Sequence, residues 1–253
     1  MRSRTDIPLS RCYTTPVPSL QKHDSPPANR LLATLARKDY QRLLPRLKQT
    51  TLVFGDVLFD PGDTIKHVYF PNDSIISLLS AVGERSTLEV GMVGNEGMAG
   101  LPIFMGVKVS RTRAIVQGAG SAMRMTAAVL REEIQGLSPL HRLLHRYTHS
   151  LLTQISQSSV CNRFHTVDAR LARWLLMTSD RLSRDEFRLT QDFMSNMLGV
   201  RREGVNKAAG ALENRKLIKY NRGELRILNR SGLEAVTCGC YAIIKTESDS
   251  YLV

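Results

Sequence analysis

Residues 188–230 decide the fold of the C-terminal part of the chain; they read RLTQDFMSNMLGVRREGVNKAAGALENRKLIKYNRGELRILNR. Thr190 can begin a first helix there, because threonine is a favoured N-cap residue. Gly199 ends that helix, since glycine adopts a left-handed backbone conformation without a Cβ clash. Between the two, apolar residues recur at three- and four-residue steps and form one helical face: Phe193, Met194, Met197 and Leu198.

A second helix is predicted from about Val200 to Lys216. Its inner face is apolar, from Val205 through Ala208 to Leu212, and packs back on the first helix. Two helices joined by a tight turn are typical of a helix-turn-helix, in which the start of the second helix enters the DNA major groove. Five side chains near that start are predicted to point outward and to bind DNA: Arg201, Arg202, Glu203, Asn206 and Lys207.

The residues after the second helix predict a hairpin. Two short apolar runs, residues 217–220 and 225–228, are separated by Asn221-Arg222-Gly223, and asparagine with glycine is typical of a tight turn. A hairpin in this position is the wing of a winged helix-turn-helix.

Charge favours DNA binding over a three-helix subdomain whose charges merely face solvent. Residues 167–230 hold 14 Lys and Arg against 8 Asp and Glu. This excess of six is half of the net charge of +12 carried by all 253 residues. Such a concentration is what binding to the phosphate backbone requires.

Composition excludes several other classes of protein. A length of 253 residues allows one or two domains, and no apolar run is long enough to span a bilayer. The first residues lack the apolar segment of a secretory signal, so a cytoplasmic location without membrane contact is expected. The four cysteines do not form a disulfide framework and are expected to be reduced thiols: Cys12, Cys161, Cys238 and Cys240.

The predicted fold class is α+β, with five segments in chain order. Residues 1–29 are rich in proline and read as a disordered arm. Asn29 caps a helix over Arg30–Gln41, and many short strands separated by turns follow between Thr50 and Met125. We therefore expect an antiparallel β-barrel over residues 30–136, a long dimerisation helix and hinge over 137–165, the winged helix-turn-helix over 166–236, and a loose tail over 237–253.

The long helix carries a heptad. Leu137, Leu144 and Leu151 are seven residues apart, and Leu140 and Tyr147 form a second track three residues later. Two such tracks predict a coiled-coil seam between two copies of the chain.

Two groups of metal-ligating residue types do not predict a metal site. His141, His145 and His149 lie four residues apart, but they drift off the heptad seam and have no neighbouring carboxylate in the sequence. Cys238 and Cys240 are too close for an ordinary zinc knuckle and lack a second cysteine pair. No catalytic residues are predicted, because no nucleophile, base and orienting group are found together.

Taken together, residues 50–236 resemble the Crp/Fnr family of bacterial transcription regulators. The segment LGVRREGVNKAAGALENRKLI is similar to the family's recognition helix, whose core is Arg-Glu-x-Val followed by a basic residue. The resemblance implies that Arg202 and Glu203 read base edges, that Lys207 contacts a base or phosphate, and that Arg201 contacts a phosphate.

The resemblance also implies that the N-terminal domain is a cyclic-nucleotide-binding-like jelly roll. Family members that bind a cyclic nucleotide hold its ribose with a glutamate and its phosphate with an arginine. Here the matching residues are Glu96, Arg111, Thr112 and Arg113. The segment between Glu96 and Arg111 is several residues too long, and Arg113 stands where a small residue is usual, so cyclic nucleotide is the candidate ligand but no cofactor is expected.

Other sensing mechanisms leave weaker signals. An N-terminal iron–sulfur cluster would need several cysteines, and only Cys12 is present there. Haem binding through His67 or His149 stays open as an alternative.

The sequence therefore predicts a homodimeric regulator that binds a palindromic operator in double-stranded DNA, with RNA polymerase as a further partner if it activates transcription. One rival hypothesis is a cyclic-nucleotide-responsive module that acts through protein contacts rather than DNA. A second rival is a metal-dependent enzyme built on the three spaced histidines.

Overall fold

The computed structural model describes residues 27–82 and 86–252, so the predicted arm over residues 1–29 lies almost wholly outside the described residues. Two helices and a short 3-10 helix come first: α1 (Arg30–Ala33), α2 (Arg37–Leu43) and η1 (Leu44–Arg46). Asn29 caps α1 as predicted, because its Oδ1 accepts a hydrogen bond from the Leu32 amide at 3.0 Å. The single helix expected over Arg30–Gln41 is wrong, since Ala36 takes an extended conformation between α1 and α2.

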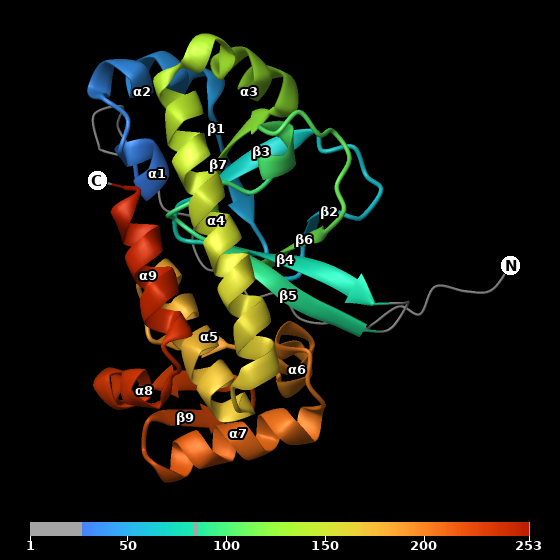
Figure 1. Ribbon diagram of the computed structural model, residues 1–253, viewed down its shortest axis with the longest axis vertical. Helices are drawn as coiled ribbons and strands as arrows, with labels where there is room; N and C mark the ends of the chain where they lie inside the picture. The colour runs from blue at the N-terminus through green and yellow to red at the C-terminus, as the bar shows by residue number, and fades with distance from the viewer. Residues whose placement is uncertain (1–26, 83–85, 253) are drawn as a thin grey trace, which may run out of the picture.

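Seven strands follow and make two antiparallel sheets in the N-terminal domain (Figure 1). One sheet has the order β1-β7-β3 and the other β2-β6-β4-β5. Their bounds are β1 (Lys48–Leu52), β2 (Val57–Phe59), β3 (His67–Pro71), β4 (Ile75–Val82), β5 (Ser86–Val93), β6 (Arg113–Gly118) and β7 (Gly120–Thr126). Neither sheet closes on itself, so the predicted barrel is corrected to two facing open sheets.

Short helical segments connect these strands to the long helix. η2 (Leu101–Ile103) lies between β5 and β6, and α3 (Ala127–Glu133) and η3 (Gln135–Leu137) follow β7. Thr126 caps α3, because its Oγ1 accepts the Val129 amide at 3.2 Å.

The long helix α4 (Pro139–Phe164) runs the length of the molecule beside both halves of the chain (Figure 1). Its heptad residues pack inside one chain rather than on a partner: Leu140, Leu144, Tyr147 and Leu151 are at most 5% exposed and belong to the core of the N-terminal domain. The predicted coiled-coil seam on these residues is therefore wrong. The fifth residue, Leu137, lies before the helix in η3 and is 65% exposed.

The C-terminal domain packs around α5 (Val167–Leu182). It contains β8 (Glu186–Arg188), α6 (Gln191–Leu198), α7 (Arg202–Asn214), β9 (Ile218–Asn221), β10 (Glu224–Ile227) and α8 (Arg230–Val236). The second core of the molecule joins α5 with side chains of the N-terminal sheet, among them Ile75, Leu79 and Met92. The two domains are thus joined by this second apolar core, to which both contribute side chains, and not only by a linker.

The last helix, α9 (Cys240–Ser250), corrects the prediction of a loose tail. It lies beside α4 (Figure 1). Tyr251 at its end is 4% exposed, and its ring stands 5.9 Å from that of Tyr147 on α4. The polar sequence of residues 245–250 hides this packing, because the buried side chains are the widely spaced Cys240, Tyr241, Ile244 and Tyr251. An ion pair between Arg30 and Asp249 at 2.8 Å adds to it.

Candidate nucleic-acid interface

The turn between α6 and α7 is built by local signals in the sequence. The Thr190 Oγ1 accepts the Phe193 amide at 3.1 Å and caps α6. Gly199 follows α6 with φ 60° and ψ 38°, the left-handed conformation expected of it. The Val200 amide then donates to the Ser195 carbonyl at 3.1 Å, so the chain turns tightly before α7 begins at Arg202.

The apolar face of α7 fixes which side of the helix is outward. Val205, Ala208, Ala209 and Leu212 are at most 4% exposed and pack in the C-terminal core. The opposite face is solvent-exposed at its N-terminal end. We call this the recognition surface, and all five predicted DNA-binding residues lie on it: Arg201, Arg202, Glu203, Asn206 and Lys207.

Gln191 belongs with the recognition surface although the sequence did not single it out. Its Nε2 donates to the Asn206 Oδ1, and its Oε1 accepts from the Arg202 Nε at 3.2 Å. Arg202 also lies 3.6 Å from Asp192, with both side chains more than half exposed. These exposed contacts hold Arg202 weakly, so it is free to exchange them for a nucleic-acid partner.

The wing is a three-stranded sheet in the order β8-β10-β9 rather than a bare hairpin. Its turn takes positive φ at Arg222 (48°) and Gly223 (85°), as the Asn-Arg-Gly sequence predicts. Lys219, Arg222 and Arg226 are exposed on this sheet, and Arg226 pairs with Glu186 at 3.1 Å.

Three of the basic residues counted in the C-terminal domain are buried: Arg170, Arg173 and Arg181 are 5–6% exposed. The sequence count therefore overstates the positive charge that this domain presents to a polyanion. The exposed basic side chains still include those of the recognition surface and of the wing.

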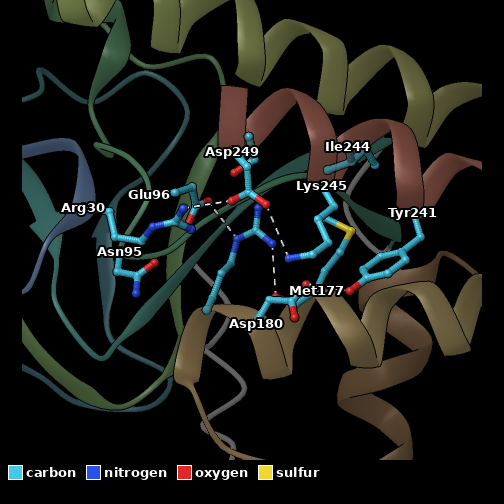
Figure 2. A pocket seen from close by; sticks show the side chains of 11 residues that line it. Arg30, Asn95, Glu96, Met177, Asp180, Tyr241, Ile244, Lys245 and Asp249 are labelled. Carbon is cyan, nitrogen blue, oxygen red and sulfur yellow. Dashed lines mark hydrogen bonds and ion pairs between the residues drawn. The ribbon is translucent and has the colours of Figure 1, made fainter. Parts of the chain in front are cut away.

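The residues predicted to hold a cyclic nucleotide are not brought together. Glu96 is 5% exposed, and its Oε1 accepts from the Arg181 Nε at 2.8 Å, while its backbone carbonyl accepts from the Tyr251 hydroxyl. We call Glu96, Arg181 and Tyr251 the junction, since they join the N-terminal domain, α5 and the C-terminus. Figure 2 shows this region from close by, with Arg30 and Asp249 beside Glu96.

The junction is a buried, polar contact. Burial raises the pKa of the Tyr251 hydroxyl, and the Glu96 carboxylate raises it further, so this tyrosine stays protonated and donates its hydrogen. A side chain at Gly94 would collide with Arg181, because a Cβ there would stand 2.5 Å from the Arg181 Cγ. The sequence predicted a role for Glu96, but nothing in it identified Arg181 as the partner.

The predicted phosphate-binding stretch, Arg111 to Arg113, lies at the far end of the sheet from Glu96. Arg113 is opposite Leu79 on β4, whereas Val93, three residues before Glu96, is opposite Ile76. Three strand residues span about 10 Å. Arg113 pairs with Asp60, Arg111 is exposed, and Thr112 uses its backbone amide to bond the Ser110 hydroxyl at 3.2 Å.

The three spaced histidines of α4 do not converge on one point. His141 and His145 pack with the ring of Phe104, at centroid distances of 5.2 and 5.3 Å. His149 instead has its Nδ1 2.9 Å from Glu247 on α9, a carboxylate that the sequence placed 98 residues away.

The comparisons with known proteins agree with this architecture. A family model described as the Crp-like helix-turn-helix domain matches residues 169–236. No curated protein matches the chain. No described helix is both long and apolar enough to cross a membrane.

Several solved structures share the fold. FixK2 from Bradyrhizobium japonicum is 16% identical, with a TM-score of 0.64 over 76% of this chain and 98% of that chain. The cyclic di-GMP responsive global regulator CLP of Xanthomonas campestris is 15% identical, with a TM-score of 0.62 over 76% of this chain and 99% of that chain. A CRP-family transcriptional regulator from Thermus thermophilus is 15% identical, with a TM-score of 0.61 over 75% of this chain and 95% of that chain.

A winged helix-turn-helix packed against two antiparallel sheets and a long helix defines a DNA-binding transcription regulator. Within that class, residues 169–236 match the Crp-like helix-turn-helix domain, and the chain shares the fold of solved Crp/Fnr regulators.

Proposed function

We propose that the protein is a homodimeric, sequence-specific regulator that binds a palindromic operator in double-stranded DNA. The observation that carries this proposal is the recognition surface: within a Crp-like helix-turn-helix domain, five polar side chains at the start of α7 are all exposed. An activating role would add a contact with RNA polymerase. No enzymatic step is proposed.

The chemistry of each side chain suggests its role on DNA. Arg202 can donate two hydrogen bonds to guanine, and Glu203 can accept from cytosine. Arg201 and Lys207 carry charge suited to phosphates, and Asn206 lies between them on the same face. The exposed wing residues Lys219 and Arg222 would add sequence-independent phosphate contacts.

Dimerisation is proposed through the outer face of α4, because its heptad residues are buried within one chain. Three apolar side chains on that helix are exposed: Leu152 (57%), Val160 (44%) and Phe164 (72%). A two-fold pair on this face would present two recognition helices, which in a dimeric helix-turn-helix lie about 34 Å apart, one turn of DNA.

The seam can be tested by substituting Leu152 with Glu, which puts a charge in the proposed interface. We expect sedimentation equilibrium to report a dimer for the parent and a monomer for the variant, with unchanged circular dichroism. Arg142→Glu changes another exposed α4 residue and serves as the matched control. A dimer that persists in the Leu152 variant would contradict this seam.

DNA binding is proposed to need no cyclic nucleotide. The relative from Xanthomonas responds to cyclic di-GMP, but in this chain Arg181 engages the Glu96 side chain and Arg113 pairs with Asp60. Calorimetric titration with cyclic AMP, cyclic GMP and cyclic di-GMP, one at a time, should give flat traces. Saturable heat at micromolar ligand would overturn this part of the proposal.

The DNA-binding function itself is tested by selecting sites from a random duplex library with purified protein. We expect enrichment of a palindrome, and fluorescence anisotropy should then give an affinity that falls steeply with salt. The rival hypothesis, a module that acts only through protein contacts, predicts no enrichment and no salt-dependent affinity.

A further inference from the structure

Four metal-ligating side chains meet where the long helix ends. Cys161 lies in the last turn of α4, and His165 follows one helical turn later as the residue after the helix. Cys238 lies between α8 and α9, and Cys240 is the first residue of α9. One ligand atom from each of the four lies within 4.8 Å of all the others. Cys238 and Cys240 have no second cysteine pair in the sequence that would complete a zinc knuckle. The fold instead brings Cys161 and His165 beside them from more than 70 residues away.

The distances within this cluster fit a single tetrahedral zinc ion. The Cys161 and Cys238 Sγ atoms are 3.4 Å apart, and the Cys240 Sγ is 3.7 Å from the His165 Nδ1. Zinc–sulfur bonds of about 2.3 Å and zinc–nitrogen bonds of about 2.0 Å place two sulfurs about 3.8 Å apart and a sulfur and a nitrogen about 3.5 Å apart in a tetrahedron. The four donors therefore stand near the corners that a zinc ion would require.

A disulfide explains the same residues less well. The Sγ separation of 3.4 Å between Cys161 and Cys238 exceeds the bond length of about 2.05 Å. Such a bond would also leave the Cys240 thiol and the His165 ring beside it without a role. Three sulfurs and one imidazole make a ligand set that soft thiolates direct toward zinc rather than toward calcium or magnesium, which take oxygen ligands.

Buried positive charge next to the cluster points the same way. Arg170 and Arg173 are 6% and 5% exposed, and the Nε atom of each has no hydrogen-bond partner among the residues described. Both arginines lie in the first half of α5, which begins two residues after His165. A zinc ion with three thiolates carries a net charge of −1, which would offset these guanidinium groups; three neutral thiols would not.

We propose that Cys161, His165, Cys238 and Cys240 bind one zinc ion in a closed, structural site. With four protein ligands no position stays open for water, so the site has no catalytic role. It ties the C-terminal end of α4 and the bend into α5 to the start of α9. Because α4 belongs to the N-terminal domain and α5 to the DNA-binding domain, zinc would hold the orientation of one domain against the other.

The first test is elemental analysis of the full-length protein, purified under reducing conditions without chelator. We expect about one zinc per chain in the parent and less than about a tenth of that in Cys240→Ser and in His165→Ala. His149→Ala is the matched control, since it removes a histidine of the same helix outside the cluster and should keep the zinc. Parent protein without zinc, or loaded with iron and inorganic sulfide, would overturn the assignment.

A second measurement avoids variants that fail to fold. Parent protein is stripped of metal by a chelator and titrated with cobalt(II). Tetrahedral thiolate coordination should give intense visible absorption and a thiolate-to-metal charge-transfer band. Both signals should saturate at about one equivalent of cobalt and disappear when zinc is added. Weak absorption typical of octahedral cobalt, or the absence of a thiolate-to-metal band, would contradict the site. Both measurements are made without DNA, so their outcome is separate from that of the proposed function.

Discussion

The recognition surface and the junction each contain a charged residue that the sequence predicts to bind a partner, Arg202 in the first and Glu96 in the second, yet the two regions differ in burial. Side chains of the recognition surface are exposed and make loose contacts, such as Arg202 with Asp192 at 3.6 Å. At the junction, the side chains of Arg181 and Glu96 are only 6% and 7% exposed and are bonded at 2.8 Å. Charge at the recognition surface is available to a partner, whereas charge at the junction is compensated within the chain.

Breaking the junction should give the largest effect. Glu96→Ala leaves the buried Arg181 guanidinium without its carboxylate, which typically costs about 3–5 kcal/mol of stability. Urea denaturation followed by circular dichroism measures this loss in the free energy of unfolding.

Arg113→Ala is the matched control, because it also removes one side of an arginine–carboxylate pair. The Arg113–Asp60 pair is 46% and 38% exposed, so its loss should cost about 1 kcal/mol or less. Equal losses in the two variants would mean that burial does not distinguish the two pairs.

The recognition surface should respond in DNA affinity instead of stability. Arg202→Ala should cost about 1–3 kcal/mol of binding free energy on the selected operator, relaxing specificity at one base pair in each half-site. Arg201→Ala should weaken operator and random DNA alike, since a phosphate contact carries no sequence information. Anisotropy titrations on both duplexes separate these outcomes, and an equal loss for Arg202→Ala on the two duplexes would exclude base reading.

The same contrast explains which parts of the structure could be predicted from the sequence. The helix-turn-helix depends on local signals, the Thr190 cap, the Gly199 turn and the apolar period of α7, and these residues lie where they were expected. The heptad of α4 also correctly marked a buried face of that helix. A period shows that a face is buried, but not whether a partner chain or the same chain covers it.

The junction and the cysteine cluster could not be predicted for a related reason. Glu96 meets Arg181 from 85 residues away, and Cys161 meets Cys238 from 77 residues away. Neither pair has a periodic or spaced motif that would link its members. Contacts of this kind follow from how the two domains pack on each other, which no single stretch of sequence encodes.

A smaller effect should follow from removing either of two tyrosine hydroxyls that donate to backbone carbonyls, Tyr251 and Tyr220. Tyr251→Phe removes the donor to the Glu96 carbonyl inside the junction and should cost about 1–1.5 kcal/mol. Tyr220→Phe removes a similar bond to the Leu189 carbonyl at 3.0 Å, but at a half-buried position in the wing, where water can replace it. We expect about 0.5 kcal/mol there by urea denaturation, and the reverse order would contradict the contrast between the two regions.

Glu89 should give an effect of a different kind, a dependence of stability on pH. The Trp174 indole donates to its Oε1 at 3.0 Å across the contact between β5 and α5. Burial raises the pKa of Glu89 from 4.5 to about 7, so the folded chain keeps a proton that the unfolded chain has already lost. This contribution is fully present below pH 4.5 and is lost as the pH rises through 7, with a slope below about 1.4 kcal/mol per pH unit.

Glu89→Gln keeps the acceptor for Trp174 and should remove the slope between pH 5 and 7. Trp174 is the one tryptophan, so its fluorescence in urea titrations at each pH reports the difference. Identical slopes of stability against pH in parent and variant would mean that Glu89 is charged in the folded chain. The contact between β5 and α5 would then be as accessible to water as the recognition surface.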